Sequence, residues 1–258
     1  MQEPILISTQ DAITIITLNR PQKRNAMNDE MVQALSHLLK KLAMDESVRV
    51  LILCGAGEHF CAGADLASMK DIGNSSDENN YQNAKIFADF MYQLHSFPKP
   101  TIALTHGIAL GGGLGLLSAC DIAIATKGSY FIFSEAKIGL AASTISPYVI
   151  AAIGERAARY YFLTGERFDA LEAKRIQLIH QIVEEESLLN TGMMLARTLL
   201  SNGPEALIAA KKLIRDVSKE KITESLVQKT AEHLAHIRSS KEAQEGLSAF
   251  LEKRNPKW

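Results

Sequence analysis

Residues 101–135 read TIALTHGIALGGGLGLLSACDIAIATKGSYFIFSE, and the rest of the chain is organised around this stretch. An apolar run leads into Gly107 and then into three consecutive glycines at 111–113. Each glycine inside a helix or strand costs roughly 0.5–1 kcal/mol relative to alanine, so three in a row need a reason. Bare backbone admits other atoms closely, and free N–H groups at a helix start can face a ligand. The stretch therefore predicts a binding surface at a strand-to-helix junction.

Glu135 closes this stretch, directly after the apolar run YFIFS. Partial burial at a strand end would raise the pKa of its carboxyl group toward neutrality, which suits a general acid or base. A strand-end carboxylate that caps the following turn is the alternative. The local sequence leaves both interpretations open.

Two loops rich in small residues follow strand-like runs, namely HFCAGAD at 59–65 and GIALGGG at 107–113. If the two loops converge, they would direct two backbone N–H groups at one oxygen atom and form an oxyanion hole. Small side chains are needed there, because a branched one would push a substrate carbonyl away from the donors. The spacing is only a weak signal, since many α/β proteins have small residues at strand ends.

A dinucleotide-binding turn is a competing interpretation of the glycines. Gly113-x-Gly115-x-x-Ser118 resembles that turn, and an acidic residue follows Gly115 at the expected distance of about 20 positions. However, residues 121–126 form a predicted strand of their own, so Glu135 would end the third strand of the unit and not the second. The topology therefore disfavours a nucleotide cofactor.

Composition excludes several other classes of protein. The net charge of −1 and the absence of a basic, aromatic stripe disfavour nucleic acid or an anionic membrane as the main partner. No basic residue precedes Arg20 and no run is long enough to span a membrane, so we expect a cytoplasmic protein without a leader peptide. Cys54, Cys61 and Cys120 lack CxxC spacing, and no HExxH or GxSxG motif occurs, so no metal site is predicted.

The first two-thirds of the chain alternate strands and helices, and the last third is helical. A hairpin is predicted at 5–18, helices at 28–45, 81–95 and 147–163, strands at 48–54 and 179–183, and a mobile excursion with almost no apolar character at 70–80. Four helices are predicted at 187–200, 204–217, 222–237 and 240–253. This order indicates an α/β fold with layered or coiled sheets.

Seven segments, in a fixed order from about residue 13 to the C-terminus, resemble the crotonase (enoyl-CoA hydratase/isomerase) superfamily. They are NRPQKRNAMN, HFCAGADL, GIALGGGLGL, ACDIAIAT, FSEAKIGL, LTGERFDALEA and EGLSAFLEKR. The resemblance implies an α/β spiral of ββα units at 1–185. It also implies a helical region at 186–258 that assembles the chain into homotrimers, often paired into hexamers.

The resemblance also implies an acyl-CoA substrate, with coenzyme A as part of the substrate and no separate cofactor or metal. The N–H groups of Ala64 and Gly112 would stabilise a thioester enolate, and Glu135 would be the principal acid–base residue. Further positions match those that line the substrate and CoA channel: Arg24, Ala26, Ala62, Asp65, Leu66, Leu110, Gly111, Gly115, Phe250 and Lys253. The last two match positions that touch the nucleotide end of CoA, sometimes from a neighbouring subunit.

Gly115 departs from the pattern of the superfamily. Hydratases of this superfamily usually carry two glutamates, and the first of them falls on Gly115, which has no side chain. A single glutamate matches the enoyl-CoA isomerases, which move one proton between the α- and γ-carbons. Dienoyl isomerases use a further acid eight positions after Glu135, where this chain has Ser143.

The segment GLAASTISPYVIAAIGERAARYY at 139–161 resembles bacterial methylglutaconyl-CoA hydratases of leucine or isoprenoid breakdown. The favoured function is therefore hydration of a short branched or carboxylated 2-enoyl-CoA, with the distal carboxylate held in space left open at Gly115. Isomerisation of an enoyl-CoA is the alternative. A non-catalytic assembly that binds CoA or RNA is a minor alternative.

Overall fold

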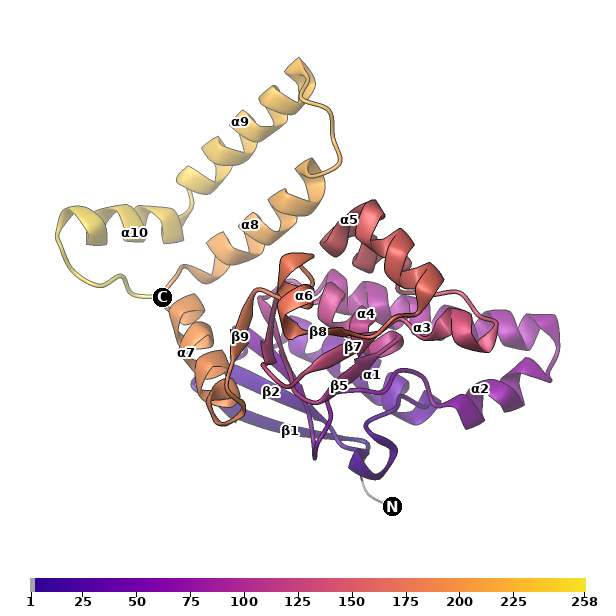
Figure 1. The fold of residues 1–258 in the computed structure, drawn as a ribbon. Helices are drawn as coiled ribbons and strands as arrows, with labels where there is room; N and C mark the ends of the chain where they lie inside the picture. Colours follow the sequence, from indigo (N-terminus) through magenta and orange to yellow (C-terminus); the bar gives the residue numbers. More distant parts are fainter. Residues whose placement is uncertain (1–2) are drawn as a thin grey trace.

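The computed structural model describes residues 3–258, which form a spiral of two sheets covered by helices (Figure 1). In the larger sheet, the first two strands form the predicted hairpin and the later pairs are parallel. Its order is β1 (Ile5–Gln10), β2 (Ile13–Leu18), β3 (Val50–Gly55), β4 (Thr101–Thr105), β6 (Ile122–Thr126) and β9 (Gln181–Val183). Strands β3 and β4 read as continuous apolar runs because helices cover both faces of this sheet.

From β4 to β7, consecutive strands alternate between the two sheets, and this alternation builds the ββα units. The smaller sheet has the order β5 (Ile108–Leu110), β7 (Tyr130–Ile132) and β8 (Phe168–Asp169). Thus β4 of the large sheet is followed by β5 of the small sheet and then by helix α4 (Gly112–Ala119). The pair β6 and β7 repeats the pattern and ends at the 3-10 helix η2 (Glu135–Ile138). The predicted α/β spiral is confirmed.

The main hydrophobic core lies between one face of the large sheet and a layer of helices. The helices that bury residues in this core include α1 (Asp29–Met44), α3 (Asp77–His95), α4 and α5 (Ser146–Thr164), the last of which is interrupted at Gly154. Asn28 caps α1, as predicted, because its side chain accepts a hydrogen bond from the Met31 N–H at 3.1 Å. Short helices complete this part of the chain: η1 (Pro21–Lys23), α2 (Leu66–Gly73) and α6 (Ala170–Arg175).

A second apolar cluster lies on the other face of the sheet and includes α7 (Leu188–Leu200), which follows η3 (Glu185–Ser187). Leu188, Met193 and Ala196 of α7 are buried there against strand residues such as Leu104. This helix falls within 186–258, which the sequence assigned to the oligomerisation region, yet it packs as a layer of the spiral core.

Residues 70–80 are largely helical, whereas the sequence predicted an excursion there and a helix that begins only at about residue 81. Helix α2 continues to Gly73, and α3 begins at Asp77. Ser76 caps α3 by accepting a hydrogen bond from the Asn79 N–H at 3.3 Å, and acidic residues follow in its first turn. This segment is polar because its side chains are exposed. The lack of an apolar period in this segment therefore reflects the solvent-exposed start of helix α3 and not a missing helix.

The remaining helices, α8 (Pro204–Val217), α9 (Glu224–Arg238) and α10 (Lys241–Leu251), form an arm that stands away from the spiral in Figure 1. Lys211 of α8 joins the arm to the core, because its Nζ donates to Asp121 Oδ2 at 2.6 Å and to the Lys99 carbonyl at 3.0 Å. Within residues 3–258, no helix combines the length and apolar character needed to cross a bilayer.

Candidate active site

The loop after β3 and the junction between β5 and α4 lie side by side. Cys61 pairs with Ala109 in a parallel bridge, and the Leu110 N–H donates to the Cys61 carbonyl at 2.9 Å. Glycines allow this contact: a Cβ on Gly113 would lie 2.5 Å from the Cys61 carbonyl oxygen. A Cβ on Gly63 would lie 2.9 Å from the Leu110 carbonyl oxygen and 3.4 Å from the Gly112 nitrogen. The two loops that the sequence singled out therefore converge.

Two free backbone donors lie at this junction. The N–H of Gly112 is in the first turn of α4, where no intrahelical acceptor exists, and Ala64 directly follows Gly63. Neither N–H donates to any acceptor among residues 3–258. Both can therefore donate to one incoming oxygen, as an oxyanion hole requires.

Glu135 is the first residue of η2, and its carboxylate points at the start of α4. Its Oε1 lies 2.9 Å from where a Cβ on Gly111 would be, so a side chain at position 111 would collide with the carboxylate. Gly111 also has a φ of +44°, a backbone conformation that favours glycine. Its Oε2 is buried and has no hydrogen-bond partner among the residues from 3 onward. Burial raises the pKa of Glu135 above its ordinary value, and a backbone hydrogen bond opposes this only in part. A carboxyl group with a raised pKa is suited to accept and return protons.

Apolar side chains pack against Gly112. A Cβ on Gly112 would lie 2.9 Å from Met27 Cε and 3.3 Å from Phe87 Cζ. Ile86 has the apolar spacing of the buried Phe90 but is 42% exposed, and it is the neighbouring Phe87 that approaches Gly112. Met27 was missed as well, although it lies between a predicted channel residue, Ala26, and a helix cap.

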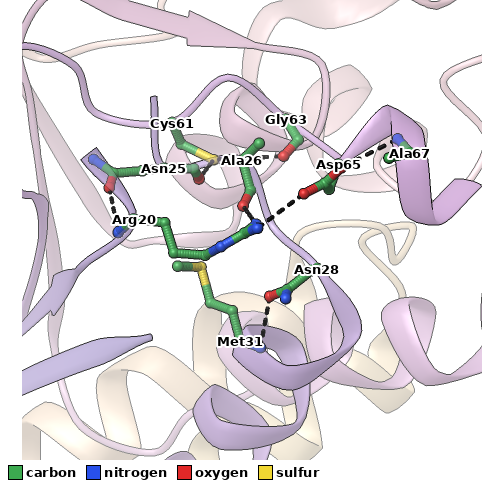
Figure 2. Close-up of polar contacts among 9 residues, drawn as sticks. All are labelled: Arg20, Asn25, Ala26, Asn28, Met31, Cys61, Gly63, Asp65 and Ala67. Atoms are coloured by element: carbon green, nitrogen blue, oxygen red, sulfur yellow. Dashed lines mark hydrogen bonds and ion pairs between the residues drawn. The ribbon is translucent and has the colours of Figure 1, made fainter. Parts of the chain in front are cut away.

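Arg20 joins the two loops that precede the site (Figure 2). Its guanidinium donates to the Ala26 carbonyl and to Asp65 Oδ2, the latter at 3.0 Å. Asp65 also caps α2 by accepting from the Ala67 N–H at 3.1 Å. Although burial opposes ionisation of Asp65, these hydrogen bonds outweigh it and lower the pKa of its carboxyl group. The carboxylate, predicted to line the CoA channel, is thus engaged inside the protein.

The sequence did not single out Arg20. The segment NRPQKRN contains two arginines, and the resemblance directed attention to Arg24. Arg24 is exposed, and its backbone adopts the left-handed conformation. Its carbonyl accepts a hydrogen bond from the Ala62 N–H at 2.9 Å. The next residue, Asn25, is fully buried, and its amide donates to the Ala56 and His59 carbonyls. Only the tertiary structure shows that Arg20, and not Arg24, is the arginine whose side chain packs inside the protein.

Most of the predicted channel residues lie around this junction. Ala26, Ala62 and Leu110 are half-buried, Gly111 is buried, and Leu66 is 59% exposed at the start of α2. Their loops are tied together by the hydrogen bonds of Met27 with the Gly63 carbonyl at 2.7 Å and with the Asp65 N–H at 2.8 Å.

The structure does not bring Phe250 and Lys253 to this junction. Phe250 belongs to α10, the last helix of the arm (Figure 1), and is 82% exposed. The arm leads away from the spiral (Figure 1), and the resemblance allows these two residues to act from a neighbouring subunit. A contact with CoA would require a second copy of the chain.

Gly115 is not beside open space, so that part of the sequence interpretation is wrong. It is buried in α4, and a Cβ on it would lie 2.3 Å from Ile145 Cγ2 and 3.3 Å from Met91 Cε. Packing of α3 and α5 against α4 fills the position. No carboxylate, from substrate or protein, can be held there while Ile145 remains.

No group of three or more histidine, cysteine or acidic residues within residues 3–258 is arranged to hold a metal ion. The cysteines near the site are buried, and burial raises the pKa of Cys61 to about 12. Its Sγ donates to the Asn25 carbonyl at 3.2 Å, so Cys61 packs between the two loops as a protonated thiol.

Comparisons with known proteins agree with this geometry. A family model described as enoyl-CoA hydratase/isomerase matches residues 8–258. The chain is 31% identical to 1,2-epoxyphenylacetyl-CoA isomerase of Escherichia coli, covering 100% of this chain and 99% of the relative. It is 30% identical to 2,3-dehydroadipyl-CoA hydratase of the same organism, with coverage of 98% and 97%.

A solved structure of an enoyl-CoA hydratase from Shewanella pealeana is similar over 99% of this chain and 96% of that chain. Its TM-score is 0.95 and its identity is 39%. With two convergent glycine-rich loops, a facing buried carboxylate and matches along nearly its whole length, this chain is an enzyme of the crotonase, or enoyl-CoA hydratase/isomerase, family.

Proposed function

We propose that this enzyme adds water to a short branched or carboxylated 2-enoyl-CoA, similar to 3-methylglutaconyl-CoA, by way of a thioester enolate. Glu135 is the acid–base residue, and the N–H groups of Ala64 and Gly112 hold the thioester oxygen. Coenzyme A enters as part of the substrate, and the reaction uses no separate cofactor. The observation that carries the proposal is the buried, unpartnered Glu135 oxygen facing the turn that presents the free Gly112 N–H.

In this reaction, one carboxylate performs both proton transfers. Glu135 accepts a proton from water as the water oxygen bonds to the β-carbon, and the double-bond electrons move onto the thioester oxygen. The two backbone donors stabilise the resulting oxyanion, a contribution typically worth about 10²–10³ in rate for each donor. Glu135 then delivers its proton to the α-carbon, so one water molecule is added and the carboxylate is regenerated.

Double-bond isomerisation of an enoyl-CoA is the second candidate. It is favoured by one observation: Ile145 and Met91 occupy the position beside Gly115, so Glu135 acts without a second carboxylate from α4. A single carboxylate suffices for isomerisation, because the proton taken from the α-carbon is returned to the γ-carbon. The same oxyanion donors serve both reactions.

A paired turnover assay distinguishes the two reactions. The purified protein is given 3-methylglutaconyl-CoA and, separately, a 3-enoyl-CoA, and the absorbance of the conjugated thioester is followed. We expect absorbance to fall with the first substrate and to stay constant with the second. A rise with the second substrate alone would replace hydration by isomerisation.

Glu135→Gln tests the site itself. We expect kcat to fall at least about 10³-fold, because general acid–base catalysis is lost, while binding of a CoA ester is retained. Binding is measured by calorimetry with a saturated acyl-CoA that cannot react. A variant that keeps nearly the full rate would overturn the assignment of Glu135.

A further inference from the structure

Gly115 occupies a sensitive position on α4, one helical turn after Gly111. The Gly115 N–H donates to the Gly111 carbonyl at 3.2 Å, and Gly111 is the residue against which the Glu135 carboxylate rests. Side chains on a helix lean toward its N-terminus. A side chain at 115 would therefore extend toward the Gly112 amide and Glu135, where the reacting acyl carbons are proposed to lie.

Ile145 takes up this position. Its Cγ2 and Cβ lie 2.3 and 2.9 Å from where a Gly115 Cβ would be, and the side chain is 2% exposed. Ile145 immediately precedes α5, and its carbonyl accepts from the N–H groups of Tyr148 and Val149, both at 3.1 Å. Because the start of α5 is held in this way, Ile145 cannot retreat without moving the helix. It acts as a fixed plug between α4 and α5.

The wall around the plug is apolar. Met91 is fully buried beside Ile145, and Phe87 and Met27 approach Gly112, the first residue of α4. One turn of helix is about 5.4 Å, roughly the length of a four-carbon acyl chain. A longer chain anchored at the Gly112 amide and directed along α4 would meet Ile145.

We propose that Ile145 is the specificity-determining residue of this enzyme: it closes the acyl pocket one helical turn behind the oxyanion donors. The pocket then accepts short acyl groups and rejects long ones, and a charged group on the substrate must point away from the plug. The same side chain excludes a second carboxylate from α4. This inference rests on the proposed function, because it takes the Gly112 amide as the anchor of the thioester.

Chain-length preference tests the plug without requiring turnover. Dissociation constants for butyryl-CoA and decanoyl-CoA, which are saturated and do not react, are measured by calorimetry for the wild type, Ile145→Val and Ile145→Ala. We expect Ile145→Ala to bind decanoyl-CoA at least 10-fold more tightly than the wild type, with butyryl-CoA changed by less than 3-fold. Ile145→Val should lie between them. Ile150→Ala, which shortens a 40% exposed isoleucine on the same helix, is the matched control and should leave both constants unchanged.

The outcomes separate the two proposals. If the wild type binds neither CoA ester, the proposed function fails. If it binds butyryl-CoA but Ile145→Ala leaves the ratio of the two constants unchanged, the role of Ile145 alone is overturned.

A second measurement tests the steric part of the inference. Gly115→Glu alone should lower the Tm by about 5 °C or more, since its Cβ would overlap Ile145. Adding Ile145→Ala should recover at least half of that loss, although Ile145→Ala by itself lowers the Tm. Simple addition of the two losses would show that the side chains do not compete for one space and would overturn the plug.

Discussion

At Glu135, burial of one carboxylate oxygen without a hydrogen-bond partner among residues 3–258 favours the protonated acid. Gly111 makes this environment possible, because any side chain there would meet Oε1. The residue thus combines a poorly solvated charge with direct access to the start of α4. Such groups are a frequent feature of active sites, where stability is given up for reactivity.

This environment predicts how stability depends on pH. Because burial raises the folded-state pKa of Glu135, its contribution to stability is full below the ordinary pKa and is lost as pH rises through the raised pKa. Glutamine is neutral throughout, so Glu135→Gln should raise the Tm at pH 8 by about 2 °C or more. The gain should shrink toward pH 4.5. Differential scanning fluorimetry at both pH values measures it, and an equal gain at both would contradict the raised pKa.

At the scale of elements, the site depends on how two loops are held together. Arg20, beside η1, binds both the Ala26 carbonyl and Asp65, and Asp65 caps α2. Ala64 lies between Gly63 and this capping residue, so the direction of the Ala64 N–H depends on the Arg20–Asp65 ion pair. The pair is mostly buried, with exposed side-chain fractions of 17% and 14%. A pair of this kind contributes more than a surface ion pair.

Arg20→Ala should therefore lower both stability and activity. We expect the free energy of unfolding to fall by about 2 kcal/mol, because Asp65 and a backbone carbonyl lose their donor. A shift of the Ala64 N–H should lower kcat/KM about 10-fold or more. Urea unfolding and steady-state kinetics measure the two effects.

Lys85→Ala is the matched control for this substitution. Lys85 pairs with Asp89 on α3, but both side chains are about half exposed. Its removal should change the free energy of unfolding by less than about 0.5 kcal/mol. Equal losses in the two variants would mean that the Arg20–Asp65 tie has no special role.

At the scale of the whole molecule, the arm of α8–α10 carries apolar side chains that are largely exposed among residues 3–258. Ile222, Leu234, Phe250 and Leu251 are between 60% and 90% exposed. The arm is nevertheless well formed, since Glu242 of α10 accepts from the N–H groups of Glu205 and Ala206 at the start of α8. Ordered helices with exposed apolar residues are typical of surfaces buried in an assembly.

We propose that this arm assembles the chain into a homo-oligomer, a trimer or a hexamer, and the prediction follows at this scale. Phe250→Asp combined with Leu251→Asp should reduce the mass measured by light scattering to that of one chain of 28.3 kDa. Met44→Asp, at an 85% exposed position at the end of α1, is the control and should leave the mass unchanged. A double variant that keeps the assembly intact would exclude α10 from the interface.

The amino-acid sequence by itself determined most of the order of strands and helices, although not α2 or the short strands β5 and β8. It also determined the two glycine-rich loops and the acidic residue after β7. These features are local: a cap, an apolar period or a run of glycines acts over a few residues. The bounds of α8 were predicted to the residue, because Pro204 marks its first turn and the apolar stripe ends at Val217.

Only the tertiary structure decided which side chains meet. Ile145 fills the position beside Gly115, and Phe87, not Ile86, packs near the site. Arg20, not Arg24, points into the protein. Helix α7 packs in the core, whereas α10 lies in the arm (Figure 1). Each of these contacts joins residues far apart in the chain. Their identity depends on how whole helices pack, and a hydrophobic period does not encode that. From the sequence, the missing side chain at Gly115 suggested open space beside α4. In the structure, Ile145 at the start of α5 fills that space, because protein interiors are close-packed.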